Sequence, residues 1–233
     1  MIALHASTIQ KSYNNRLILD LDLRFEGTGL HVILGPNGCG KSTLLKLLAL
    51  LDVPDKGNIL LRRNGAVLPQ DQMSRHTIVL APRPEGLFNQ TVHKNVHYGL
   101  KLRKVPPKEC SVRINDVLAA VGLSALSRAN ALTLSSGEKQ RLCMAMAIAV
   151  SPEVILLDEP TSSLDPHNVE QIEKIITLMK EEKRMVILVT HNISQARRLA
   201  DTVTFMGAGG AVSQRSAKQF FLTFDKDGLD GYL

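Results

Sequence analysis

One glycine-rich stretch limits what this chain can fold into more than any other part of its sequence. It matches the pattern G-x-x-x-x-G-K-S/T at every fixed position, and its residues are Gly35, Pro36, Asn37, Gly38, Cys39, Gly40, Lys41, Ser42 and Thr43. The apolar run 30–34 before it predicts a buried strand, and the leucine-rich run 44–48 after it predicts a helix. This order of strand, loop and helix favours a phosphate-binding loop over an ordinary glycine-rich turn.

The chemistry of this loop predicts a nucleoside triphosphate and Mg²⁺ as its ligands. Glycines let the backbone wrap closely around a phosphate, so that successive N–H groups point at its oxygens. A helix that begins near Lys41 directs the positive end of its dipole to the same place. The ammonium group of Lys41 can reach the outer phosphates, and the hydroxyl of Ser42 can be a ligand of Mg²⁺.

Composition and charge are those of a globular protein and exclude few other classes. Hydrophobic residues make up 44% and charged residues 21% of the 233 residues, and the apolar runs are far shorter than the ~20 residues that cross a bilayer. Three cysteines without a C-x-x-C pair, and an N-terminus unlike a secretory signal, predict a cytoplasmic protein with reduced thiols. The net charge of +6 includes a basic run, 101–113, which we interpret as a solvated helix face; a surface for anionic lipid or nucleic acid is the alternative.

The N-terminal third predicts an antiparallel layer of strands around the glycine-rich loop. Apolar and polar residues alternate over 19–25, as in a strand that is buried on one face, and an earlier strand is expected over 3–9. Asn64 and Gly65 indicate a tight hairpin turn between two short apolar runs. The run 78–80 predicts a further short strand, which we place in the same layer.

The rest of the chain predicts a helical segment followed by alternating strands and helices. Between 91 and 150 the pattern is helical, with Pro106 and Pro107 separating two helices and a capping box expected at Ser135 and Glu138. The short apolar runs 154–157, 186–189 and 203–206 alternate with the periodic segments 166–181 and 194–199. This alternation predicts an α/β fold with a parallel sheet and helices on its faces.

Three polar side chains follow the predicted parallel strands, where α/β folds bind their ligands. Asp158 ends a buried strand and can hold Mg²⁺, and the next residue, Glu159, is placed to orient or deprotonate a water that attacks the γ-phosphate. His191 ends the following strand and can donate a hydrogen bond to that phosphate. Taken singly, Asp158 can also be a helix cap and His191 a structural histidine.

A second candidate anion site lies before the helix that begins near residue 136. Small residues at a capped helix N-terminus bind anions, although an ordinary capped helix has the same pattern. The residues of this stretch are Leu134, Ser135, Ser136, Gly137 and Glu138.

These motifs, in this order, resemble those of the ATP-binding subunit of an ABC transporter over nearly the whole chain. The resemblance makes residues 35–43 the Walker A loop, 134–138 the signature motif and 154–159 the Walker B strand. It also implies roles for single residues: Tyr13 stacks on adenine, Glu159 is the catalytic glutamate, His191 is the switch histidine, and Ser163, Leu164 and Asp165 form the D-loop.

The fold implied by the resemblance is that of a P-loop NTPase with a RecA-like parallel-sheet core. An antiparallel β subdomain and an inserted α-helical subdomain complete a single ABC ATPase domain over 1–233. The catalytic core and its antiparallel layer are expected over 1–83 and 151–233, and the helical subdomain with the signature motif over 84–150.

The resemblance further implies a head-to-tail homodimer that holds two ATP molecules and hydrolyses them to power transport. It implies integral membrane permease subunits as partners, a solute-binding protein as an indirect partner, and a peripheral location on the cytoplasmic face of the membrane. The stretches 87–92 and 190–201 are similar to those of importers of oxyanions such as tungstate, molybdate or phosphate. No nucleic acid is expected; the alternatives are a soluble ABC ATPase acting on nucleic acid or ribosomes, and the motor subunit of a lipid or protein extruder.

Two positions depart from the family pattern. The signature motif usually reads LSGGQ, whereas this chain has Ser136 and Glu138 at its third and fifth positions. The family also has a glutamine near Mg²⁺ and the attacking water, and here Pro82 or Arg83 takes its place. The nearby glutamines, Gln70, Gln72 and Gln90, are out of register with that position.

Overall fold

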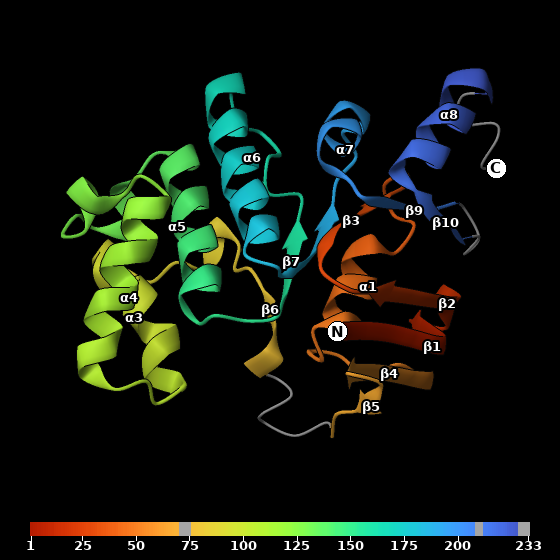
Figure 1. The fold of residues 1–233 in the computed structure, drawn as a ribbon, viewed down its shortest axis with the longest axis horizontal. Coiled ribbons are helices and arrows are strands. Elements are labelled where there is room, and N and C mark those ends of the chain that lie inside the picture. Colours follow the sequence, from red (N-terminus) through yellow and green to blue (C-terminus); the bar gives the residue numbers. More distant parts are fainter. Residues whose placement is uncertain (70–75, 208–211, 228–233) are drawn as a thin grey trace. The chain divides into compact units, whose positions relative to one another are not determined.

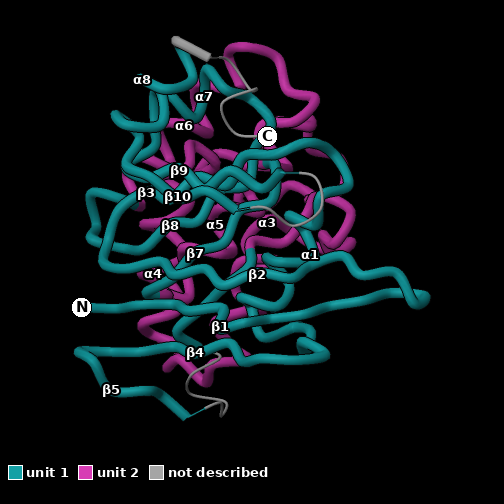
Figure 2. Tube along the Cα trace, turned by 90° about the vertical axis from the view of Figure 1, so that its right-hand side faces the viewer, with its two compact units in different colours: residues 1–80, 153–159, 180–233 teal, residues 81–152, 160–179 magenta. Residues whose placement is uncertain are grey.

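The structure is a computed structural model that describes residues 1–69, 76–207 and 212–227. Contacts between residues divide it into two units (Figure 2): a core unit of residues 1–80, 153–159 and 180–233, and a helical unit of residues 81–152 and 160–179. The sequence placed 1–83 and 151–233 in the core, whereas this division assigns 81–83, 151–152 and 160–179 to the helical unit. Two of the off-register glutamines, Gln70 and Gln72, lie outside the described residues.

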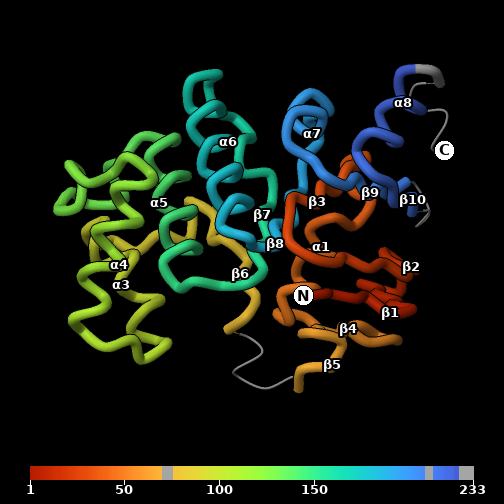
Figure 3. The backbone as a smooth tube through the Cα atoms, in the orientation of Figure 1, coloured from red at the N-terminus to blue at the C-terminus, as the bar shows by residue number. Residues whose placement is uncertain are grey.

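The first sheet of the core unit is antiparallel, as predicted, with the strand order β2-β1-β4-β5 (Figures 1 and 3). Its alternating apolar side chains face inward, since Leu19, Leu21, Leu23 and Phe25 are all buried. The predicted hairpin turn is present, with Asn64 and Gly65 both at positive φ, 51° and 84°. The strands are β1 (Ile2–Tyr13), β2 (Arg16–Glu26), β4 (Lys56–Arg63) and β5 (Ala66–Val67).

The second sheet of the core unit has the strand order β10-β9-β3-β8-β7-β6. Five of these strands, β9, β3, β8, β7 and β6, are parallel to one another, as predicted for an α/β fold. Strand β10 pairs antiparallel with β9 at one edge. The placement of 78–80 in the antiparallel layer was wrong, because Ile78 pairs in parallel with Val154 of β7. The strands are β3 (Gly29–Leu34), β6 (Ile78–Leu80), β7 (Val154–Asp158), β8 (Met185–Val189), β9 (Thr202–Met206) and β10 (Val212–Ser216).

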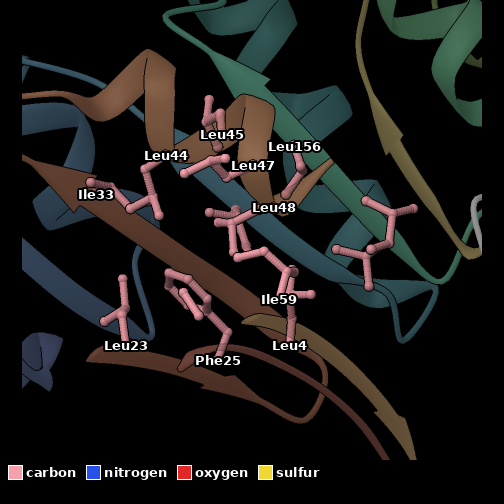
Figure 4. Packing of buried hydrophobic residues seen from close by; sticks show 14 of the residues in the cluster. Leu4, Leu23, Phe25, Ile33, Leu44, Leu45, Leu47, Leu48, Ile59 and Leu156 are labelled. Atoms are coloured by element: carbon pink, nitrogen blue, oxygen red, sulfur yellow. The ribbon is translucent and has the colours of Figure 1, made fainter. Parts of the chain in front are cut away.

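Helix α1 (Lys41–Leu48) lies between the two sheets and fills the core (Figure 4). It carries four leucines that are fully buried, and each contributes on the order of 2 kcal/mol of hydrophobic stabilisation. Alternate residues of the parallel strands, such as Ile33 and Ile187, join this cluster with Leu4 and Phe25 of the antiparallel sheet. The loop before α1 is therefore held by a helix that is packed on both sides.

Two further helices belong to the core unit, α7 (Ile193–Leu199) and α8 (Ala217–Asp227). The residues of the parallel strands that do not face α1 point to the opposite side of the sheet. Phe205 of β9 meets Phe220 of α8 with ring centroids 6.4 Å apart. The guanidinium of Arg197 lies 4.5 Å from the ring centre of Phe221, and this cation–π contact joins α7 to α8. The sequence predicted α7 but neither β10 nor α8.

The helical unit contains the predicted helices, and their ends follow the expected capping rules. Pro107 is at the start of its helix, and the side chain of Thr91 accepts a hydrogen bond from the N–H of Lys94. No helix in the described part of the chain is long and apolar enough to cross a membrane. The helices are α3 (Val92–Leu102), α4 (Pro107–Ala120), α5 (Ser136–Ala149) and α6 (Pro166–Glu181), whose residues up to 179 belong to this unit.

A buried histidine in β3 predicts that the stability of the core unit falls in acid. His31 is 5% exposed, its Nδ1 lies 2.8 Å from Oγ1 of Thr202, and burial lowers its pKa from 6.5 to about 4. Because the unfolded chain takes up this proton at a higher pH than the folded chain, the free energy of unfolding falls as the pH drops from 6.5 to about 4. The full effect of this one group is roughly 3 kcal/mol.

Urea unfolding at several pH values checks this prediction, with His31→Gln as the variant that removes the titrating group. We expect the variant to lose less stability than the wild type over that range, whereas the exposed His167→Gln should behave like the wild type. Equal acid sensitivity in His31→Gln and the wild type would contradict the assignment.

Candidate active site

The glycine-rich loop joins β3 to α1, and two of its glycines are required by their surroundings. A Cβ at Gly35 would lie 2.4 Å from the carbonyl oxygen of Met206, so the backbone of β9 leaves room only for hydrogen. Gly40 has φ 100° as the N-cap of α1, and a Cβ there would lie 2.6 Å from the side chain of Leu19. Packing against β9 and β2 therefore fixes the loop at the N-terminus of a buried helix.

The ammonium group of Lys41 lies inside this loop. Lys41 is only 6% exposed, and its Nζ donates hydrogen bonds of 2.9 Å to the carbonyl oxygens of Gly35 and Pro36. A positive charge and the N-terminus of α1 thus meet at one place, which suits the binding of a polyanion.

Two oxygen donors from different elements meet beside the loop. The hydroxyl of Ser42, in the first turn of α1, donates a 3.3 Å hydrogen bond to Oδ1 of Asp158, the last residue of β7. Across the described residues, no group of three or more His, Cys, Asp and Glu side chains could hold a metal ion. A hydroxyl and one carboxylate nevertheless suit Mg²⁺, which takes most of its ligands from water and substrate phosphates.

The other predicted polar residues come together at the ends of adjacent strands. Strands β3, β8 and β7 are neighbours in the sheet, so the residues that follow them lie at one edge. Glu159 follows β7, and its N–H donates a 3.0 Å hydrogen bond to the carbonyl oxygen of Val189. Nδ1 of His191 lies 3.3 Å from Oε2 of Glu159, and the two side chains are 60% and 30% exposed, so both are open to a ligand.

Glu159 also has an unfavourable backbone conformation. Its φ is 48°, in the left-handed region that costs a non-glycine residue on the order of 1 kcal/mol. The hydrogen bond from its N–H to Val189 holds the backbone in place.

Tyr13 ends β1 and is held by two residues that the sequence did not single out. Its hydroxyl donates a 2.6 Å hydrogen bond to Oδ2 of Asp52, and Nζ of Lys11 lies 5.2 Å from its ring centre. Lys11 also donates a 2.9 Å hydrogen bond to Oδ1 of Asp52. The hydrogen bonds from Tyr13 and Lys11 lower the pKa of Asp52 to about 2, so this carboxylate stays charged and keeps the partly exposed ring in place.

In the helical unit, the predicted signature residues form the start of α5. Ser135 is the N-cap, and its Oγ accepts a 3.4 Å hydrogen bond from the N–H of Glu138. Oε2 of Glu138 in turn accepts 2.8 Å hydrogen bonds from the N–H and the hydroxyl of Ser135, and these hydrogen bonds lower the pKa of Glu138. The capping box is confirmed, and it gives the departure from glutamine at Glu138 a structural role.

The remaining predicted residues also lie in the helical unit. Ser163 has φ 60°, and Asp165 caps α6, since its Oδ1 accepts a 3.0 Å hydrogen bond from the N–H of Asn168. Arg83, which with Pro82 is one of the two candidates for the position of the missing glutamine, precedes a short 3₁₀ turn, Pro84–Gly86, and its carbonyl oxygen accepts a 2.9 Å hydrogen bond from the N–H of Gly86. Gln90 lies just before α3, where its carbonyl oxygen accepts a hydrogen bond from Ala131.

Comparisons with known proteins agree with this arrangement. The family model described as ABC transporter matches residues 18–162. The tungstate uptake system ATP-binding protein TupC of Peptoclostridium acidaminophilum is 35% identical over 205 residues, which are 87% of this chain and 94% of that protein. The L-cystine transport system ATP-binding protein TcyN of Escherichia coli is 34% identical over 232 residues, 95% of this chain and 93% of that protein.

A solved structure has the same fold. CbiO1 from Clostridium perfringens, part of the ABC transporter complex cbiONQ, superposes with a TM-score of 0.82 at 28% identity and covers 94% of this chain and 90% of its own. The mixed parallel and antiparallel sheets are thus those of an ABC ATPase. The chain therefore belongs to the ABC transporter family, as one of the ATP-binding subunits whose ATP hydrolysis powers transport.

Proposed function

We propose that this chain hydrolyses ATP on the cytoplasmic face of a membrane to drive import of an oxyanion through separate permease subunits. The observation that carries the proposal is the edge of the parallel sheet, where Lys41, Ser42, Asp158, Glu159 and His191 come together. A buried cation, two oxygen donors, and a carboxylate beside an imidazole are the groups that phosphoryl transfer to water needs.

In this proposal each group has one task. Lys41 leaves the carbonyl oxygens of the loop and binds the outer phosphates, while the loop N–H groups hold the phosphate oxygens. Glu159 orients and deprotonates the attacking water, and His191 donates a hydrogen bond to the γ-phosphate. Tyr13, fixed by Asp52, offers its ring to the adenine.

Ser42 and Asp158 are the residues that would hold Mg²⁺. The two oxygens already lie 3.3 Å apart, so both can direct a lone pair at one ion or at a water bound to it. When bound, Mg²⁺ neutralises charge on the phosphates, and the chain contributes the ligand positions.

We propose further that two copies pair head to tail around two ATP molecules, each held by the Walker A loop of one copy and residues 134–138 of the other. The signature residues suit this task because Ser135 and Gly137 lie at the N-terminus of a helix of fourteen residues, where N–H groups and the dipole favour a phosphate. The carboxylate of Glu138 accepts hydrogen bonds from the N–H and the hydroxyl of Ser135, which holds it against the start of the helix.

The transported solute is proposed from the relatives. A tungstate uptake protein matches nearly the full chain, which favours an oxyanion such as tungstate, molybdate or phosphate, delivered by a solute-binding protein. The L-cystine transport protein, at 34% identity over 95% of this chain, makes an amino acid the second candidate.

Uptake in cells that lack this chain tests the proposal. We expect tungstate, molybdate or phosphate uptake to fall and to be restored by the wild-type chain but not by Glu159→Gln, and a permease subunit to co-purify from solubilised membranes. Loss of L-cystine uptake alone would select the second candidate. Unchanged uptake of all four solutes with co-purifying ribosomal material would overturn the transport assignment.

A further inference from the structure

A steric contact inside the helical unit joins the signature motif to the start of α6. Gly137 is buried, and a Cβ at this position would lie 2.0 Å from Oδ1 and 2.2 Å from Cγ of Asn168. Asn168 is in the first turn of α6, and Gly137 is in the first turn of α5. The starts of the two helices therefore meet in a tight contact, and a side chain at position 137 would require the amide of Asn168 to move.

Hydrogen bonds hold Asn168 at this contact from both sides. Its Oδ1 accepts a 2.9 Å bond from Nη1 of Arg141, one turn further along α5. Its Nδ2 donates a 2.6 Å bond to Oδ2 of Asp165, whose Oδ1 accepts from the N–H of Asn168. These bonds with Asn168 lower the pKa of Asp165, so the carboxylate is a charged acceptor. One amide side chain thus links Arg141 in the signature helix to Asp165 in the D-loop.

We propose that Asn168 is a positioning residue that makes the D-loop and the signature motif move as one body. In the ATP-bound dimer of the proposed function, on which this inference rests, both segments face the second copy. A phosphate that binds residues 135–137 then also positions Asp165. The contacts run from Gly137 and Arg141 of α5 to Asn168, and from Asn168 to Asp165. A defect in this link should weaken dimer closure and leave ATP binding to the Walker A loop of a single copy unchanged.

The test measures ATP-driven dimerisation by light scattering after gel filtration, in a Glu159→Gln background that prevents turnover. We expect Asn168→Ala to raise the ATP concentration for half-maximal dimerisation about tenfold, because it removes two side-chain hydrogen bonds that involve charged partners. The affinity of the monomer for a fluorescent ATP analogue should change less than twofold. Glu170→Gln is the matched control, because Glu170 is on the same helix and pairs with Lys174 one turn away at 2.7 Å.

A second variant tests the steric part of the link. Gly137→Ala should disrupt dimerisation strongly when Asn168 is present, because its Cβ would overlap the amide, and much less in the Asn168→Ala background, where that space is free. Equal damage in both backgrounds, or unchanged dimerisation in Asn168→Ala, would overturn the inference.

Different results would count against the proposed dimer and against the role of Asn168. Absence of ATP-driven dimers in Glu159→Gln with Asn168 intact would count against the dimer itself. In that case thermal unfolding still tests the contact between Gly137 and Asn168. Gly137→Ala should lower the melting temperature when Asn168 is present and have little effect in the Asn168→Ala background. Additive effects of the two substitutions on the melting temperature would reject it.

Discussion

Glu159→Gln is expected to lower the rate of ATP hydrolysis by a factor of roughly 10² to 10⁴ while ATP still binds. Glutamine has nearly the same shape, and the N–H that donates to Val189 belongs to the backbone, so the local fold is kept. The amide cannot take a proton from water, and the carboxylate that lies 3.3 Å from His191 is lost. Steady-state phosphate release and calorimetric ATP binding measure the two effects separately.

A matched control separates this effect from a general loss of charge. Glu26→Gln removes a carboxylate from the same unit, where Glu26 pairs with Arg24 at 2.5 Å and is about half exposed. It should leave both hydrolysis and ATP affinity within twofold of the wild type. Hydrolysis by Glu159→Gln at a rate near that of the wild type would remove Glu159 from the catalytic role.

Local patterns were enough to predict much of this fold. The alternation in β2 determined which face is buried, and the capping box at Ser135 and Glu138 determined where α5 begins. The place of the Walker A loop between a strand and a helix was predictable from its glycine pattern. The place of Glu159 was predictable because a residue that follows a buried parallel strand lies at the edge of the sheet. These features depend on neighbours within a few positions along the chain.

Features that depend on distant parts of the chain were not predictable in the same way. The three-residue strand β6 contains no sign of its partner, and Ile78 pairs with Val154, far along the sequence. Strand β10 was missed because it is a partly exposed edge strand with the polar sequence VSQRS. Asp52 became visible as a partner of Tyr13 only in three dimensions, where β4 and β1 pair and bring the segment before β4 to the end of β1.

Lys41→Ala is expected to lower the affinity for ATP by roughly 30- to 160-fold, since a charged hydrogen-bonding group is worth about 2–3 kcal/mol when it binds phosphate in a partly buried site. Lys41 is almost fully buried in the loop, and its Nζ donates hydrogen bonds to the carbonyl oxygens of Gly35 and Pro36. The substitution therefore removes the cation and also two hydrogen bonds that hold the loop without nucleotide. Calorimetry measures the affinity, and urea unfolding should show a smaller loss, about 1 kcal/mol.

Lys46→Ala is the control, because Lys46 is on the same helix, has the same charge and is exposed in its last turn. It should leave the ATP affinity unchanged within twofold, since an exposed charge that far from the loop is screened by water and salt. If Lys41→Ala bound ATP as tightly as Lys46→Ala, the ammonium group would have no part in binding phosphate. The loop N–H groups and the dipole of α1 would then have to account for the whole affinity.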